Sequence, residues 1–504
     1  MVQLLLISFI VAIALHDSGV RAASCAEPVG WLWTLLPFAV IALIVQLFIA
    51  WCGRRLDATG RGRYIARADQ VLSMSRLATA VVHGWAVLFG GWMETVRASI
   101  GEVVLLDKLV VIAPAVTTLA LGWASYYGID RRLREATLMG LLDTGSPVRS
   151  LPTRWEYVSD QIRHQVLIIL GPMAVVTAWA GGLEKLAYYV RDTRPELARQ
   201  AWVMWTFELA QLGGIILLLA LMPLGLRLVW RTVRLGPGAI RERLEALCTR
   251  QGVRCRDFLV WRTHTDMVNG ALVGIVPGLR YILLTDALLE RLNERQVEAV
   301  MAHEVAHARR HHIPWLLVCV VSSVAIASVI VEGAARVLLR DGARIDWWQR
   351  GWGEGIGAPL SLGAGLMVFG WVSRRFEQQA DAFAAQHLRG FRAPRPSAQP
   401  MPAISGEAVE AMSGALLSVA RLAHMPEGKF SFRHGSILTR CRNLQGISGM
   451  YANRLPIDRT VRRIKLAAAV GLASAIGLVV YTSGAGGSPM EDESSGEGAV
   501  QVHR

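Results

Sequence analysis

Residues 299–315, AVMAHEVAHARRHHIPW, hold two histidines four positions apart, with a glutamate directly after the first. Four residues make about one helical turn, so His303 and His307 project from the same helix face, roughly 6 Å apart along the axis. Two imidazoles placed in this way can share one tetrahedral zinc ion, and Glu304 can act on a water there as general base. HExxH also occurs by chance in solvated polar helices, so its flanks must decide.

The flanks predict where this helix begins and which residues cannot be ligands. Asn293 is a good N-cap, and Gln296 stands three residues later, as in a capping box. A catalytic zinc site needs a third protein ligand beside the histidine pair. His311 lies on the same helix face as His303. In a continuous helix the two are eight residues, about 12 Å, apart, which is too far for them to share one ion. We therefore expect His311 and His312 to be interfacial side chains.

A second polar helix, SRRFEQQADAFAAQH (373–387), offers the missing ligand. Glu377 and Asp381 are four residues apart and hence on one helix face. One carboxylate can ligate zinc while the other orients a ligand histidine from behind. Taken alone, the segment would be an ordinary charged helix face. Together with HEVAH it completes a hydrolase site with one open coordination position.

The composition indicates a membrane protein that must carry these helices. Of the 504 residues, 53% are hydrophobic and only 18% are charged, compared with about 25% charged in soluble domains. The mean hydropathy is +0.37. The net charge of +14 comes from arginines, since there are only four lysines. These arginines cluster between apolar runs, which favours membrane topology over nucleic-acid binding.

Eight apolar runs approach the roughly 20 residues that cross a bilayer. They are 30–52, 77–98, 104–127, 166–190, 203–230, 313–337, 357–373 and 465–483. Arginines crowd segments 53–70, 128–165 and 231–312, which the positive-inside rule assigns to the cytoplasm. This assignment requires the 77–98 run to cross. Both zinc-bearing helices are expected to continue into membrane runs, with a kink at Pro314.

These features predict a mainly α, polytopic helical membrane protein with a cytoplasmic zincin-like metalloprotease domain that contains a small β-hairpin or sheet. The expected parts are a signal peptide or N-terminal membrane helix (1–22), a multi-helix transmembrane region (30–230), the first part of the protease domain (231–312), two membrane helices (313–373), the second part of the protease domain (374–464) with a Pro-rich linker (389–403), a last membrane helix (465–483) and a disordered acidic tail (484–504).

The hairpin is expected over residues 266–285. ALVGIV and RYILL flank Pro277-Gly278, a turn dipeptide. Its free edge could take an extended peptide by strand addition, which presents a scissile bond without much sequence preference. A purely structural hairpin would have the same sequence, so both interpretations stay open.

The six cysteines show no metal-ligand spacing. Cys52 and Cys319 lie in apolar runs, where a buried free thiol is expected. Cys248 and Cys255 could pair, but we expect them to be reduced because they fall on the cytoplasmic side.

With these motifs in this order, residues from about 240 to 445 resemble the membrane zinc metalloproteases of the HtpX type and the CAAX prenyl protease. YILLTDALLERLNERQVEAVMAHEVAHARRHH resembles the strand, turn and active-site helix of that family. SRRFEQQAD resembles its second zinc helix. The resemblance implies one zinc ion held by His303, His307 and Glu377, with Glu304 as general base and Asp381 behind the ligands.

The resemblance also implies roles for three residues outside these helices. RHGSILTRCRNL is similar to the family's His-Pro-Ser segment, with Gly435 in place of proline. By that match His434 stabilises the oxyanion of the tetrahedral intermediate, and Arg440 holds it in place. The match to the family's Asn-Ala element is approximate, since Gly270 intervenes, and it makes Asn269 a substrate contact.

The predicted function is that of a zinc-dependent integral-membrane endopeptidase in a bacterial cytoplasmic membrane. Its partners would be the lipid bilayer and protein or peptide substrates in or near the membrane, cleaved at the cytoplasmic face. HEVAHARRHHIPW also resembles the β-lactam sensor-transducers, whose metalloprotease domain serves signalling. A non-catalytic membrane scaffold is the third alternative.

Overall fold

The computed structural model describes residues 6, 8–13, 30–143, 151–230, 232–262, 268–338, 353–388, 403–423 and 425–485. Several sequence-based predictions lie wholly or mostly outside these residues. They concern the signal peptide (1–22), the linker (389–403), the acidic tail (484–504) and the start of the Asn-Ala element at Asp266-Met267.

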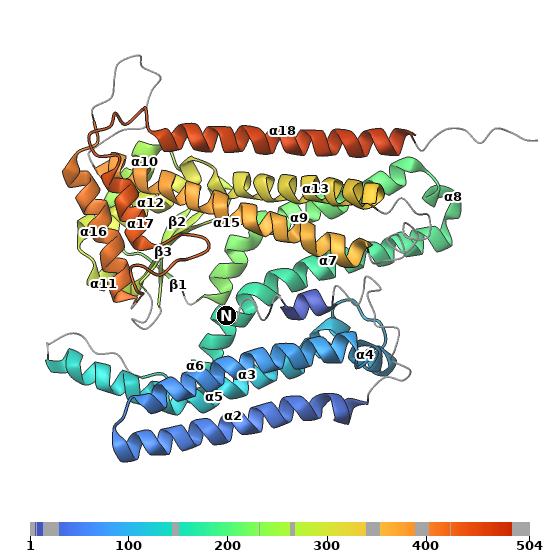
Figure 1. Cartoon of the computed structure of the whole chain (residues 1–504), viewed down its shortest axis with the longest axis horizontal. Helices are drawn as coiled ribbons and strands as arrows, with labels where there is room; N and C mark the ends of the chain where they lie inside the picture. Colours follow the sequence, from blue (N-terminus) through green and yellow to red (C-terminus); the bar gives the residue numbers. More distant parts are fainter. Residues whose placement is uncertain are drawn as a thin grey trace, which may run out of the picture. The chain divides into compact units, whose positions relative to one another are not determined.

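The described chain is mainly helical and carries one small sheet (Figure 1), which confirms the predicted fold class. Its helices are α2 (Trp31–Thr59), α3 (Arg63–Leu88), α4 (Trp92–Ile100), α5 (Leu106–Asp143), α6 (Arg154–Gln161), the π-helical turn η1 (Ile162–Leu167), α7 (Ile168–Thr193), α8 (Pro195–Ala198), α9 (Ala201–Val229), α10 (Ala239–Gln251), the 3-10 turn η2 (Pro277–Leu279), α11 (Asp286–Arg291), α12 (Glu294–Arg309), α13 (His312–Leu338), α15 (Gly353–Leu388), α16 (Gly406–Leu422), α17 (Ile437–Gln445) and α18 (Pro456–Ala485). Its strands are β1 (Thr232–Arg234), β2 (Asp257–Trp261), β3 (Gly270–Val273) and β4 (Tyr281–Thr285).

Six described helices are long and apolar enough to cross a membrane. They are Trp31–Thr59, Arg63–Leu88, Leu106–Ala136, Arg154–Thr193, Trp202–Arg227 and His312–Ala335. Six of the eight predicted runs overlap these helices. The runs 357–373 and 465–483 lie in α15 and α18, which are not among the six.

The predicted run 77–98 is not one crossing helix, which corrects its boundaries. α3 ends at Leu88, and Gly91 takes a left-handed conformation with φ of 65° before α4 begins. Glycine adopts this conformation without steric penalty, so the Gly90-Gly91 pair ends the helix. The candidate span therefore starts at Arg63, inside the arginine-rich segment.

The described residues form two compact units. In the first, which runs to Arg309 and includes residues 414–425, α2, α3 and α5 lie side by side (Figure 1). Their apolar faces meet in a buried core that includes Ile49 and Cys52 of α2, Leu72 of α3 and Ile129 of α5. Cys52 is thus a buried free thiol, as expected.

The small sheet also belongs to the first unit and has the strand order β1-β2-β4-β3. β3 and β4 pair antiparallel, with Leu272 opposite Ile282, which confirms the predicted hairpin. β2 joins β4 in parallel, and β1 joins β2 antiparallel. β3 is therefore an edge strand of this sheet. One sheet face packs against the end of α9 through Trp261, Tyr281 and Leu224.

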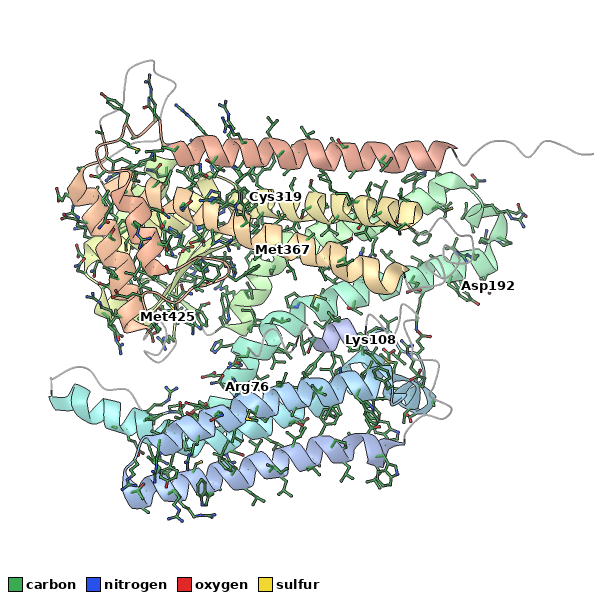
Figure 2. All side chains as sticks on the ribbon, viewed as in Figure 1. Arg76, Lys108, Asp192, Cys319, Met367 and Met425 are labelled. Atoms are coloured by element: carbon green, nitrogen blue, oxygen red, sulfur yellow. The ribbon has the colours of Figure 1, made fainter. Side chains whose placement is uncertain are left out.

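In the second unit, α13, α15 and α18 lie side by side (Figure 1). Cys319 of α13, labelled in Figure 2, is buried with Phe376 of α15 and Val461 of α18. His312 begins α13 and is 2% exposed, with its Nε2 2.9 Å from Gln379 Oε1 and its ring stacked on Phe376. The expectation of an interfacial His312 is wrong, because α15 covers it.

Candidate active site

The helix that carries HEVAH, α12, begins where the sequence predicts. The backbone N–H of Gln296 donates to Asn293 Oδ1 at 2.9 Å, and the backbone N–H of Asn293 donates to Gln296 Oε1 at 3.2 Å. This reciprocal pair is a capping box, which satisfies N–H groups that the first turn leaves open. Gln296 Nε2 also donates to Ser418 Oγ of α16 at 2.9 Å. The start of α12 is thus fixed at both backbone and side-chain level.

The two histidines of α12 meet through the nitrogens that a metal would use. His303 Nε2 and His307 Nε2 are 3.3 Å apart, and the rings are nearly perpendicular at 72°. Two nitrogens that each lie about 2.05 Å from a zinc ion at the tetrahedral angle are about 3.3 Å apart. His303 is 7% exposed, and His307 is half-buried. The pair therefore has the spacing of two ligands on one ion.

Glu304, between these histidines, is linked to the sheet edge. Its Oε2 accepts a hydrogen bond from the backbone N–H of Leu272 in β3, with a separation of 3.3 Å. The predicted general base is therefore positioned beside the edge strand of the predicted hairpin, for which the sequence left peptide docking and a structural role both open. The contact uses a backbone group, which no residue type in the sequence signals.

The helix that carries the histidines does not run straight into the next apolar run. α12 ends at Arg309, and α13 begins at His312. His311 between them has a φ of 55°, the left-handed region that non-glycine residues seldom adopt. The expectation of one continuous helix kinked at Pro314 is wrong. Pro314 instead lies in the first turn of α13, where its missing N–H breaks no helical hydrogen bond.

Asn269 immediately precedes β3, and its backbone is held by one threonine of β4. Its N–H donates to Thr285 Oγ1 at 3.0 Å, and its carbonyl accepts from the Thr285 N–H at 3.0 Å. Its side chain is exposed. The amide of Asn269 is thus available at the start of the edge strand, where the resemblance implies a substrate contact.

The carboxylates of the second predicted helix lie in the buried part of α15. Glu377 is 5% exposed and Asp381 is 3% exposed. Arg440 of α17 donates to both Asp381 oxygens, through Nε at 2.9 Å and Nη2 at 2.6 Å. Its Nη1 lies 3.6 Å from Glu377 Oε2. One guanidinium therefore compensates the charges of two carboxylates, in the two-pronged geometry that arginine favours.

His434 lies beside Glu377, in the loop before α17. Its Nδ1 is 3.1 Å from Glu377 Oε1, and its side chain is 45% exposed. The N–H of Gly435 donates to the Ser431 carbonyl at 2.8 Å, and the Ser431 N–H donates to the Gly435 carbonyl at 3.1 Å. Gly435 has a φ of 75°, a left-handed conformation that glycine adopts without steric penalty. A glycine thus shapes the loop where the family pattern has proline.

Among the described residues, three side chains form a group that could hold a metal ion: His303, His307 and Glu377. Each offers one ligand atom, and these atoms lie within 4.8 Å of one another. Two imidazole nitrogens and one carboxylate oxygen are the donor set of a catalytic zinc site, which keeps its fourth position open. The chemistry of the donors therefore fits zinc.

Two contributions to this site were not apparent from the sequence. Leu272 acts through its backbone N–H, so its residue type gives no signal. Arg440 was expected to hold His434, and the contacts observed for its guanidinium are the paired hydrogen bonds to Asp381 and the approach to Glu377. The pairing of Arg440 with Asp381 joins residues 59 positions apart, and only the tertiary fold reveals it.

Comparison with known proteins gives matches to the part of the chain that contains the candidate site. Residues 238–446 match the profile of Peptidase family M48. A protein named Protease HtpX homolog from Bacteroides fragilis is 27% identical over 230 residues, which are 43% of this chain and 65% of that protein. A CAAX prenyl protease 1 homolog from Arabidopsis thaliana is 26% identical over 251 residues, 46% of this chain and 54% of that protein. The chain thus spans less than two thirds of the length of these relatives.

A solved structure, the crystal structure of S. mikatae Ste24p, aligns with 83% of this chain at 16% identity and a TM-score of 0.42. Residues 238–446, which match the family profile, include every residue of the candidate site. The match to Peptidase family M48 over residues 238–446 falls on the same part of the chain whose motifs resemble the membrane zinc metalloproteases.

Proposed function

We propose that this chain is a zinc-dependent integral-membrane endopeptidase. The observation that supports it most is the group of three ligand atoms from His303, His307 and Glu377, with Glu304 between the histidines. The curated relatives are named as proteases, and the matched family is a peptidase family. Six helices long and apolar enough to cross a bilayer support the membrane assignment.

In this proposal His303, His307 and Glu377 hold one zinc ion. When bound, zinc acts as a Lewis acid that polarises the scissile carbonyl and lowers the pKa of a water. Glu304 takes a proton from the attacking water while the water oxygen bonds to the carbonyl carbon. Glu304 then passes that proton to the amide nitrogen as the carbon–nitrogen bond breaks. His434 donates a hydrogen bond to the oxygen that gains negative charge.

Arg440 and Asp381 act through other residues. The paired hydrogen bonds between them fix Arg440 against α15, and Arg440 in turn lies beside Glu377. A ligand carboxylate held by a fixed guanidinium cannot rotate away from the ion without losing a charged contact. Both residues are therefore positioning residues for Glu377.

We place the site at the cytoplasmic face and expect substrates in or near the membrane. The support is the crowding of arginines in 53–70, 128–165 and 231–312, which the positive-inside rule assigns to the cytoplasm. The edge strand β3 offers an extended substrate segment a partner for main-chain hydrogen bonds.

The decisive test is a Glu304→Gln variant of the full-length protein in detergent, assayed for bound zinc and for casein cleavage. General-base catalysis contributes about 10²- to 10⁴-fold, so cleavage should fall by that factor while zinc stays bound. Glu377→Gln should lose zinc as well as cleavage. Glu294→Gln is the matched control, since Glu294 lies on the same helix and is exposed.

The outcomes separate the proposed enzyme from a non-catalytic scaffold and test the roles of Glu304 and Glu377. A wild-type protein that binds zinc but cleaves nothing would point to a scaffold. Cleavage that survives in Glu304→Gln would remove Glu304 from the mechanism. Zinc binding that survives unchanged in Glu377→Gln would remove Glu377 from the ligand set.

A further inference from the structure

Two cysteines face each other at the end of α10, away from the zinc ligands in sequence. Cys248 lies in the last turn of α10, and Cys255 lies in the short segment that connects α10 to β2. Their Sγ atoms are 3.9 Å apart. A disulfide has an S–S distance of about 2.05 Å, so the sulfurs need to approach by a little under 2 Å. Only the connecting segment, which has no regular structure, has to move.

The surroundings give the two thiols different reactivity. The hydrogen bond with Cys248 lowers the pKa of the Cys255 thiol and outweighs the opposite effect of burial. The positive charge of Arg280 lowers the pKa of both thiols. The same hydrogen bond, together with burial, raises the pKa of Cys248. Cys255 is half-buried, whereas Cys248 is 6% exposed. Since the thiolate is the nucleophile, Cys255 is the thiol that an oxidant meets first.

We propose that Cys248 and Cys255 form a reversible dithiol–disulfide pair, oxidised by a peroxide and reduced by a dithiol reductant. The pair consists of two free thiols. In this proposal its oxidation is a response to a change in redox conditions and not a permanent crosslink.

The chemistry balances with one peroxide per pair. The Cys255 thiolate attacks one oxygen of hydrogen peroxide and breaks the O–O bond, which gives a sulfenic acid and a hydroxide that takes up a proton to become water. The Cys248 sulfur then loses its proton and attacks Cys255 Sγ. The S–S bond forms, and hydroxide leaves and is protonated to a second water. Two thiols and one peroxide thus give one disulfide and two waters.

Arg280 connects this pair to the strand beside Glu304. Its guanidinium donates to the carbonyl oxygens of Gly274 at 3.2 Å and Ile275 at 2.8 Å, directly after β3. Its own carbonyl accepts from the Arg256 N–H at 2.7 Å, one residue after Cys255. Closing the disulfide pulls this segment toward α10, and the pull is transmitted through Arg256 and Arg280 to the end of β3. Oxidation should therefore loosen the strand whose Leu272 N–H binds Glu304.

Peptide mapping of the full-length protein tests the pair directly. Trypsin cuts after Arg250 and Arg254, so the two cysteines fall on separate peptides that only a disulfide can join. After hydrogen peroxide we expect this joined species in the mass spectrum, and its loss after dithiothreitol. Cys255→Ser should abolish it. Cys441→Ser, which removes a buried thiol of α17, is the matched control and should leave it unchanged.

Two results would overturn the proposed disulfide. One is Cys255 oxidised to sulfinic acid without any joined peptide, and the other is thiols that stay fully alkylatable after peroxide. The functional link rests on the proposed protease activity and has its own readout. Peroxide should cause a reversible loss of casein cleavage in the wild type and none in Cys255→Ser. If the wild type cleaves no casein at all, the protease proposal fails, while peptide mapping still decides the cysteine pair.

Discussion

The residues of the candidate site are held by two kinds of interaction. Glu377 and Asp381 are buried carboxylates that depend on the charge of Arg440. His303 and His307 lie one helical turn apart, which brings their Nε2 atoms to 3.3 Å. Removing Asp381 therefore leaves the buried charge of Arg440 without its paired hydrogen bonds. Removing His303, His307 or Glu377 takes away a proposed ligand.

Arg440→Met should destabilise the protein strongly. Breaking a buried ion pair by removing one partner costs about 3–5 kcal/mol, because the remaining charge stays buried. Arg440→Met combined with Asp381→Asn should recover part of the loss, since one uncompensated carboxylate is then neutral. Urea unfolding in detergent measures the free energies of the single and double variants.

Arg442→Met is the control for this pair of variants. Arg442 lies on the same helix but is exposed, so its replacement should change stability by no more than about 0.5 kcal/mol. An Arg440→Met protein as stable as the Arg442→Met protein would contradict the role assigned to the ion pair.

At the scale of the elements, the local signals were predictive. Asn293 and Gln296 indicated the start of α12, and Pro277-Gly278 indicated the turn of the β3–β4 hairpin. Each feature depends on residues only a few positions apart. The parallel pairing of β2 with β4 was not predicted, because Asp257–Trp261 is short and its partner lies more than twenty residues away.

The break between α12 and α13 could not be read from the sequence either. His311 takes a left-handed conformation without the glycine that normally marks one. The local sequence is compatible with one long helix, and the hydropathy pattern favours it. Tertiary contacts of the neighbouring residues, such as His312 with Gln379, are needed to compensate the local strain.

His311→Gly should therefore stabilise the protein. A left-handed residue with a Cβ costs about 1–2 kcal/mol, which glycine avoids, although glycine gives back part of this through chain entropy. We expect a gain of roughly 1 kcal/mol in the free energy of unfolding. Thermal or urea unfolding in detergent measures it.

Arg309→Gly, at the last residue of α12, is the matched control with the opposite sign. Glycine within a helix is about 1 kcal/mol less favourable than a good helix former. Should both glycine variants lower stability equally, His311 would carry no strain and the break would need another cause.

At the scale of the whole molecule, composition and hydropathy predicted a helical membrane protein, and six candidate spans support this. The charge distribution predicted its orientation, which cysteine labelling can measure. In a cysteine-free background, Arg61→Cys lies between α2 and α3, and Glu102→Cys lies between α4 and α5. A membrane-impermeant maleimide should label position 102 in intact cells and position 61 only after permeabilisation.

The labelling experiment has a clear opposite outcome. Both positions are exposed, so a failure to label cannot come from burial in the protein. Labelling of position 61 in intact cells would reverse the orientation. It would also move the proposed active site to the other face of the membrane.

The hydrogen bond from the Leu272 N–H to Glu304 has a consequence for the strand addition proposed at β3. The Glu304 carboxylate already accepts a hydrogen bond from the Leu272 N–H. A chain that adds to β3 must therefore offer a free backbone carbonyl that replaces the carboxylate as the acceptor. Helical or sheet-bound segments have already committed their carbonyls within their own folds. Locally unravelled segments have not. If the proposed protease activity holds, this contact would favour targets by the conformational state of their backbone more than by their side chains.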